Sequence, residues 1–120
     1  LHETALRWAP PPVRVFAQTQ TFEPTRPNPH GPGQLPVTVP DSVQVVTHLA
    51  NGGRGLYDFS GVRLLGPGKQ IHLYGSSGTI KVEFGPGGTE RVFGGRCGDT
   101  ALKEIDIPAE YRGHWRVEEE

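Results

Sequence analysis

The sequence predicts an α+β fold that is mostly one open, antiparallel β-sheet in meander order, with short or truncated helices at both ends. Two runs, residues 43–50 and 56–62, alternate apolar and polar side chains and are rich in β-branched and aromatic residues, as is typical of half-buried strands. A third run covers residues 71–81, and glycine-rich turns separate the three runs as in consecutive hairpins. Glycine and proline, 17 and 12 of the 120 residues, favour short strands and turns over long helices.

Length and composition predict a single domain over residues 1–120. The formal net charge of −1 argues against a nucleic-acid partner, which needs a basic surface. No apolar run reaches the ~18 residues of a membrane span. Cys97 is the only cysteine, so no intrachain disulfide is expected, and the start of the chain lacks a signal-peptide pattern. We therefore expect a cytoplasmic location. Because the chain starts at Leu1 and contains no methionine, we also expect a piece of a longer protein.

Further strands are expected on both sides of this meander. Residues 13–22 carry large apolar side chains on both faces, including Phe16 and Phe22, which predicts an inner strand covered on each side. In the strand at 79–84, alternation places Ile80, Val82 and Phe84 inward and the polar residues outward. Short strands are also expected at residues 90–93 and 102–107, the latter at a sheet edge.

Both ends of the chain have helical features. Residues 1–9 read as the last turns of a helix, which ends at three consecutive prolines, Pro10 to Pro12. Residues 113–120 read as the start of another helix. The segment between the first two expected strands, residues 23–40, contains six prolines and no Phe, Tyr or Trp. It predicts an exposed, proline-rich loop, and a disordered segment or flexible flap is favoured over a binding loop.

Candidate chemistry is sparse. None of the five histidines has the short spacing of a zinc site, although His48 and His72 would be neighbours if their strands adjoined. Cys97 lies beside Arg96, but no sequence signature supplies a general base for it. The glycine-rich segment at 52–55 reads as a hairpin turn in preference to an anion site built with Arg54. The residues alone predict no metal site and name no reaction.

Four segments in the right order resemble the C-terminal domain of the Gfo/Idh/MocA oxidoreductases. Residues 71–80 (IHLYGSSGTI) look like the family's I-H-x-x-G-x-x-G-x-L hairpin, and residues 108–120 (PAEYRGHWRVEEE) resemble its P…G-x-W-x-V-E-E lead into a helix. Residues 45–55 (VVTHLANGGRG) are similar to the strand and turn before that hairpin. Residues 6–8 (LRW) followed by 12–15 (PVRV) resemble the family's R-W-L-x-G-x-P-x-x-V passage.

The resemblance implies a substrate-binding and oligomerisation domain of an NAD(P)-dependent oxidoreductase that acts on a sugar, polyol or related compound. It implies a Rossmann domain upstream that binds NAD or NADP, so this chain alone is expected to bind no cofactor and to be catalytically silent. The family's catalytic histidine stands just before the helix that ends in Arg-Trp. His2 is the nearest candidate here, about one residue short of that spacing.

Other classes of function stay open. A free-standing β-rich module that binds carbohydrate would use aromatic side chains as stacking platforms, and the chain offers Trp8, Tyr57, Tyr74, Tyr111 and Trp115. A purely structural oligomerisation domain is the third possibility. Since the expected sheet has apolar residues on both faces, we predict a homo-oligomer built through a sheet face.

Overall fold

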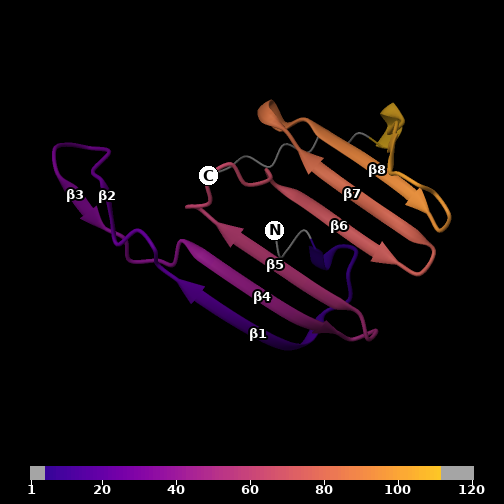
Figure 1. Ribbon diagram of the computed structural model, residues 1–120, viewed down its shortest axis with the longest axis horizontal. Helices are drawn as coiled ribbons and strands as arrows, with labels where there is room; N and C mark the ends of the chain where they lie inside the picture. Colours follow the sequence, from indigo (N-terminus) through magenta and orange to yellow (C-terminus); the bar gives the residue numbers. More distant parts are fainter. Residues whose placement is uncertain (1–4, 112–120) are drawn as a thin grey trace. The chain divides into compact units, whose positions relative to one another are not determined.

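Short antiparallel strands make up most of the chain that the structure, a computed structural model, describes, which is residues 5–111 (Figure 1). Every strand pairing among these residues is antiparallel, which confirms the predicted strand direction. The strands and the two 3-10 turns are β1 (Pro12–Gln20), β2 (Thr25–Pro27), β3 (Gln34–Pro36), β4 (Ser42–Leu49), β5 (Arg54–Ser60), β6 (Gln70–Gly75), β7 (Gly78–Phe84), η1 (Pro86–Gly88), β8 (Glu90–Arg96), β9 (Lys103–Ile105) and η2 (Ala109–Tyr111).

The chain divides into two compact units, Leu1–Leu64 and Leu65–Glu120. The first unit contains a sheet of order β1-β4-β5 and a separate hairpin, β2-β3, and the second contains a sheet of order β6-β7-β8-β9. The predicted meander is therefore interrupted, because β5 and β6 belong to different sheets. The glycine- and proline-rich connection between them replaces the tight turn that hairpin pairing needs.

The sheet of the first unit is built around the β4-β5 hairpin. Its turn closes with hydrogen bonds from Leu49 N–H to Gly53 O and from Gly52 N–H to Leu49 O, both 2.9 Å long. Gly52 has a φ of 85°, which glycine adopts without steric cost. β1 pairs with β4 and forms an edge of this sheet. The prediction of an inner strand covered on both sides was wrong: Phe16 and Val15 are exposed side chains of an edge strand.

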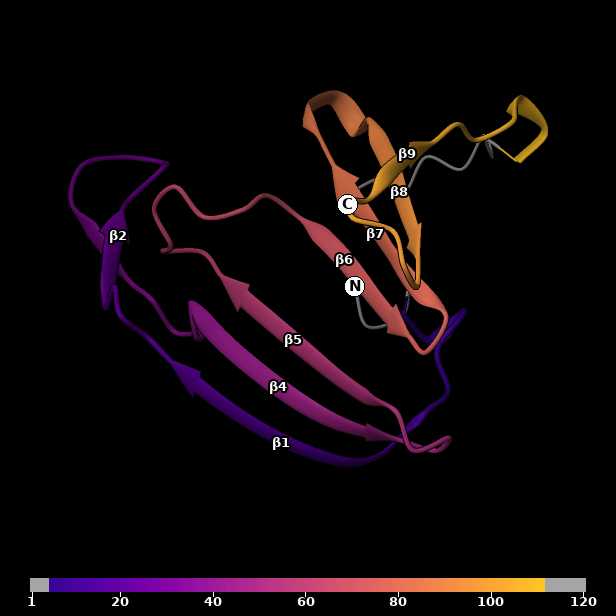
Figure 2. The same cartoon turned by 45° about the vertical axis from the view of Figure 1, so that its right-hand side comes forward.

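The proline-rich segment at 23–40 is exposed along most of its length, as predicted, but it contains the β2-β3 hairpin instead of being wholly irregular. We call this hairpin and its flanks, residues 21–41, the arm (Figure 2). At its tip, Asn28 N–H donates to Gly33 O. At its base, the Asp41 carboxylate accepts hydrogen bonds from the backbone N–H groups of Phe22 and Glu23, both at 2.9 Å.

The sheet of the second unit separates its side chains by chemistry. The pairs Leu73–Ile80, Ile80–Gly94 and Val82–Val92 place apolar residues on one face, as alternation along β7 predicted. This apolar face carries Ile71, Leu73, Ile80, Val82, Phe84, Val92 and Ile105. The opposite, polar face carries Gln70, His72, Tyr74, Lys81, Glu83, Arg91, Phe93 and Glu104.

Burial among the described residues is slight. Ala5 is the only hydrophobic residue of residues 5–111 that is buried, and no side chain in this range is fully buried. Ile80 and Ile105 of the apolar face are exposed, as are Phe16, Val46 and Leu56 of the first sheet. Burial of apolar surface is the main favourable term in folding. Contact of these exposed apolar side chains with a further protein surface would therefore be stabilising.

Helical structure is limited in the described part of the chain. Ala5 and Leu6 are helical, and Ala9 N–H donates to Ala5 O at 2.8 Å before the prolines, in agreement with a helix end at this point. The helix expected at 113–120 lies outside the described residues. Within residues 5–111 there is no helix of the length and hydropathy needed to cross a membrane. That residues 1–120 form a single domain stays a prediction.

Candidate functional site

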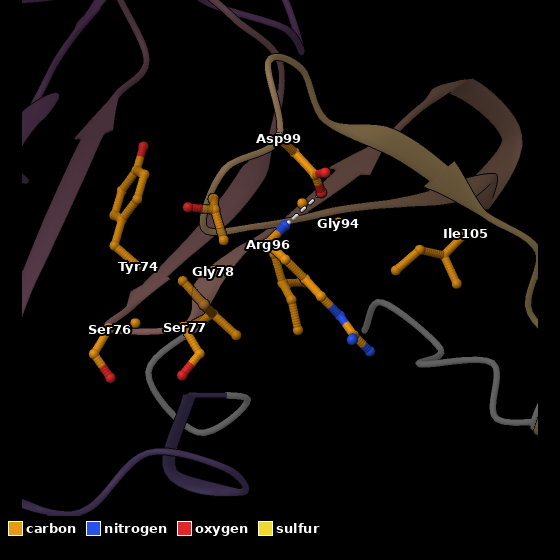
Figure 3. A pocket seen from close by; sticks show the side chains of 13 residues that line it. Tyr74, Ser76, Ser77, Gly78, Gly94, Arg96, Asp99 and Ile105 are labelled. Atoms are coloured by element: carbon orange, nitrogen blue, oxygen red, sulfur yellow. Dashed lines mark hydrogen bonds between the residues drawn. The ribbon is translucent and has the colours of Figure 1, made fainter.

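A groove of 690 Å³ lies at one end of the second sheet, around the β6-β7 turn (Figure 3). Its volume falls within the range of small-molecule sites, roughly 300–1,000 Å³. The walls come from the apolar face and the turn, and the other contributions come from β8, the loop after it and β9. The lining residues are Leu73, Tyr74, Gly75, Ser76, Ser77, Gly78, Thr79, Ile80, Gly94, Gly95, Arg96, Asp99 and Ile105.

Glycines form the floor of this groove because the neighbouring strand lies too close for a side chain. A Cβ atom at Gly78 would lie 2.3 Å from the backbone oxygen of Gly95 on β8. A Cβ atom at Gly94 would lie 2.7 Å from Cδ1 of Ile105. Glycine inside a strand often marks a close backbone approach of this kind. Because glycine has no side chain, a hollow remains here, and it is bordered by the apolar side chains of Leu73, Ile80 and Ile105.

Polar groups gather at the end of the hollow. Arg96 is paired with Gly78 in the β7-β8 ladder, and its side chain points away from Tyr74 (Figure 3). The Asp99 carboxylate accepts a 2.8 Å hydrogen bond from the backbone N–H of Arg96 and so fixes the loop after β8. The backbone N–H of Cys97 donates to the carbonyl oxygen of Ser77 at 3.0 Å, which ties this loop to the β6-β7 turn.

On the polar face, a row of three side chains leads away from the groove along β6. The hydroxyl of Tyr74 lies 2.9 Å from Nδ1 of His72, and Nε2 of the same ring lies 3.0 Å from Oε1 of Gln70. Tyr74 is 77% exposed. Two ion pairs lie on this face, Lys81–Glu83 and Arg91–Glu104, each at 2.6 Å. The side-chain hydrogen bond from Lys81 lowers the pKa of Glu83, and that from Arg91 lowers the pKa of Glu104.

The lining of the groove combines polar and apolar residue types. Arg96 and the two turn serines line it together with Leu73, Ile80 and Ile105, and such a mixture is typical of sites for ligands with an apolar body and a polar end. Among the described residues, neither Ser76, Ser77 nor the exposed Cys97 has a hydrogen-bonded histidine or carboxylate that could act as its general base. Residues 5–111 also contain no cluster of three metal-ligating side chains.

The candidates that the sequence indicated lie on different elements of the fold. His48 lies on β4 and His72 on β6, in different sheets, so no strand pairing makes them neighbours. Arg54 donates to the carbonyl oxygens of Gly52 and Gly53 at 2.6 and 3.1 Å, so this arginine stabilises its own turn and the hairpin interpretation is confirmed. His2 lies outside the described residues.

The aromatic candidates are likewise dispersed. Tyr57 stacks on Phe59 with ring centroids 6.1 Å apart, whereas Trp8, Tyr74 and Tyr111 are exposed. Trp115 lies outside the described residues. They therefore do not form one platform within either unit, and Tyr74 alone borders the groove.

Sequence reasoning missed Arg96, Asp99 and the pair Gly94–Gly95 as site residues. The signal that would have found them is the Gly-Gly-Arg segment on β8, because consecutive glycines in a strand indicate a close approach. No protein-family model matches the chain, and no curated protein or solved structure is similar enough to count as a match.

Proposed function

We propose that this chain is a substrate-binding and oligomerisation domain of an NAD(P)-dependent oxidoreductase that acts on a sugar, polyol or related compound. The proposal takes its chemistry from the resemblance of residues 71–80 to the Gfo/Idh/MocA hairpin. The observation that carries it is the contact under that hairpin: a Cβ at Gly78 would lie 2.3 Å from Gly95 O. The second glycine of the I-H-x-x-G-x-x-G-x-L pattern thus has a physical reason in this chain.

In this proposal the domain contributes binding and assembly but not hydride transfer. Hydride transfer needs a nucleotide held against the substrate, and that task belongs to a Rossmann domain upstream in a cytoplasmic parent protein. Exposed apolar side chains on both sheets, among them Phe16, Leu56 and Ile80, support a role in assembly, since exposed apolar patches usually mark interfaces. The partners are the Rossmann domain and a second copy that packs against a sheet face.

The coding sequence upstream of Leu1, as far as roughly a hundred residues or more before it, tests this proposal. It should encode, in frame, a strand followed by a Gly-x-Gly-x-x-Gly turn that opens a helix. In addition, calorimetric titration of the 120-residue chain with NADH and NADPH should give no one-site binding at micromolar concentrations. Either an upstream region without the fingerprint or tight nucleotide binding by this chain would overturn it.

A second candidate function is carbohydrate binding by the polar face of the second sheet. The supporting observation is the row Tyr74–His72–Gln70, in which an exposed ring stands beside hydrogen-bonded polar groups. Sugars stack on such rings and use adjacent polar atoms for orientation. Binding to immobilised oligosaccharides that is lost in Tyr74→Ala and kept in Tyr111→Ala, which removes an equally exposed ring elsewhere, would favour this function over the first.

A further inference from the structure

The outer edge of β1 has no strand partner among residues 5–111. In the order β1-β4-β5, β1 pairs only with β4. At nine residues it is the longest strand that the structure describes, and all of it after Pro12 is exposed. A strand edge presents a row of unpaired backbone N–H and C=O groups, and natural proteins normally block such an edge or pair it.

The features that block an edge are confined to the start of β1. Proline occurs only at Pro12, the register with β4 shifts between Pro12 and Arg14, and Arg14 is the single charged residue. Residues 15–20 have none of these features. By contrast, Pro27 and Pro36 remove backbone donors from β2 and β3. β9 is three residues long and carries Lys103 and Glu104. The other edge strands of the two larger sheets, β5 and β6, have seven and six residues. β1 is therefore the longest edge strand in residues 5–111, and its part after Arg14 has the character of a pairing surface.

The sequence of β1 is complementary to itself in one register. Phe16 is the midpoint of Pro12–Gln20, so an antiparallel copy related by a two-fold axis at Phe16 overlaps the full strand. In that register Phe16 lies opposite Phe16 of the second copy, and Val15 lies opposite its Ala17. Arg14 lies opposite Gln18 of the second copy, so no like charges meet. Aromatic and β-branched cross-strand pairs are favourable contacts of this kind.

We propose that β1 pairs edge to edge with β1 of a second copy of this chain, with the two-fold axis at Phe16, to give one continuous sheet that joins the β1-β4-β5 sheets of both copies. The occupant is a second copy because this register brings two Phe16 rings together at the axis and places the only charged residue, Arg14, opposite the neutral Gln18. This contact uses backbone hydrogen bonds along a sheet edge. It is distinct from the packing of a sheet face in the proposed function, and it does not depend on that function.

Opposite charges at position 16 test the axis. Phe16 is 69% exposed, so Phe16→Lys and Phe16→Glu should each leave the monomer folded, which circular dichroism checks. Each variant alone places like charges opposite each other and should weaken self-association by about tenfold or more. An equimolar mixture of the two variants should associate again, because an ammonium group on one copy then faces a carboxylate on the other. Sedimentation equilibrium measures all three. A wild-type chain that stays monomeric, or a mixture that fails to recover association, would overturn the proposal.

Cysteine cross-linking distinguishes the edge contact from a face contact. In a Cys97→Ser background, Phe16→Cys should form a covalent dimer with a short bifunctional thiol reagent. Val46→Cys is the matched control: it lies opposite Phe16 on β4, and three strand spacings would separate two copies by about 14 Å. Gln18→Cys is a second control on the same face of β1, about 13 Å from its copy along the strand. Efficient linkage at Val46 instead of Phe16 would replace edge pairing by face packing.

Discussion

The backbone N–H of Phe22 donates a 2.9 Å hydrogen bond to Oδ1 of Asp41, at the other end of the arm. The second carboxylate oxygen accepts from Glu23 N–H, and the Asp41 carbonyl accepts from Gly61 N–H at 2.8 Å. Asp41 is only 7% exposed. One residue therefore joins the two ends of the arm to the first sheet, and the base of the arm is held in place.

Replacing Asp41 should loosen the arm. Asp41→Asn keeps one carbonyl acceptor but puts an NH₂ group where Glu23 N–H now donates, so one hydrogen bond is lost and two donors meet. We expect a melting temperature lower by several degrees and faster hydrogen exchange at the amides of Phe22 and Glu23. Asp58→Asn is the control, since Asp58 is exposed and bound by Gln44 and Arg63 side chains. An equal effect of both substitutions would contradict the special role of Asp41.

The same contact predicts an acid dependence. Hydrogen bonds from the backbone N–H groups of Phe22 and Glu23 lower the pKa of Asp41. A carboxyl whose folded-state pKa lies below its unfolded value contributes stability above the unfolded value, about 3.9. That contribution is lost as the pH falls through the folded-state pKa. The stability difference between wild type and Asp41→Asn should therefore shrink below about pH 4. Urea unfolding from mildly acidic to strongly acidic pH measures it, and a difference that is constant with pH would be inconsistent with this linkage.

For the arm, the sequence predicted exposure but not the contacts that hold its two ends. Six prolines correctly indicated an exposed segment, but the local pattern could not reveal that Asp41 closes it from 18 residues away. Likewise, alternation in β1 gave a strand with apolar residues on both faces, and the sequence carries no local signal that such a strand lies at an edge. Strand position is a property of the whole sheet, whereas alternation reports only which side chains share a face.

The candidate site, too, could be predicted only in part from the sequence. The β6-β7 hairpin follows from Gly75-Ser76-Ser77-Gly78 between two apolar runs. The groove beside it depends on β8, whose Arg96 pairs with Gly78 across a register that the sequence does not encode locally. For the same reason the sequence could not show that the strands of His48 and His72 belong to different sheets.

A methyl group at Gly78 should strain the second sheet. Gly78→Ala places Cβ 2.3 Å from a backbone oxygen, so β7 and β8 must separate. We expect a loss of about 1–3 kcal/mol in the free energy of unfolding, as for overpacking elsewhere. Gly75→Ala is the matched control on the paired position, where the nearest atom lies at 3.5 Å. Denaturant unfolding compares the two, and a Gly78→Ala chain as stable as the control would show that the strands are not held this closely.

Thr47 should be replaceable by valine at a gain in stability. Its side chain is 3% exposed, and Oγ1 has no hydrogen-bond partner in the described structure. A buried hydroxyl without a partner costs about 1–3 kcal/mol, and valine has nearly the same shape without this cost. Thr47→Val should therefore raise the free energy of unfolding by about 1 kcal/mol, whereas Thr47→Ala, which leaves a void, should lower it. A destabilised valine variant would mean that the hydroxyl has a bound partner, such as water.

The connection between the two units should be the first site of proteolysis. Leu64 and Leu65 are 90% and 105% exposed, and Leu65 has a φ of 53°, which is uncommon for a residue with a branched side chain. Thermolysin cuts before large apolar residues in segments that open easily. We expect the first cut at Leu64 or Leu65, which would give fragments close to the two compact units. This cut should precede any cut in the arm, because the Asp41 contacts and the β2-β3 hairpin hold the arm in place.

In the double variant Leu64→Ser, Leu65→Ser this cut should disappear while the melting temperature is unchanged, since both side chains point into solvent. Mass spectrometry identifies the fragments. First cuts within residues 23–40 would instead support the flexible flap that the prolines of that segment predicted, and would show that the Asp41 contacts do not order it.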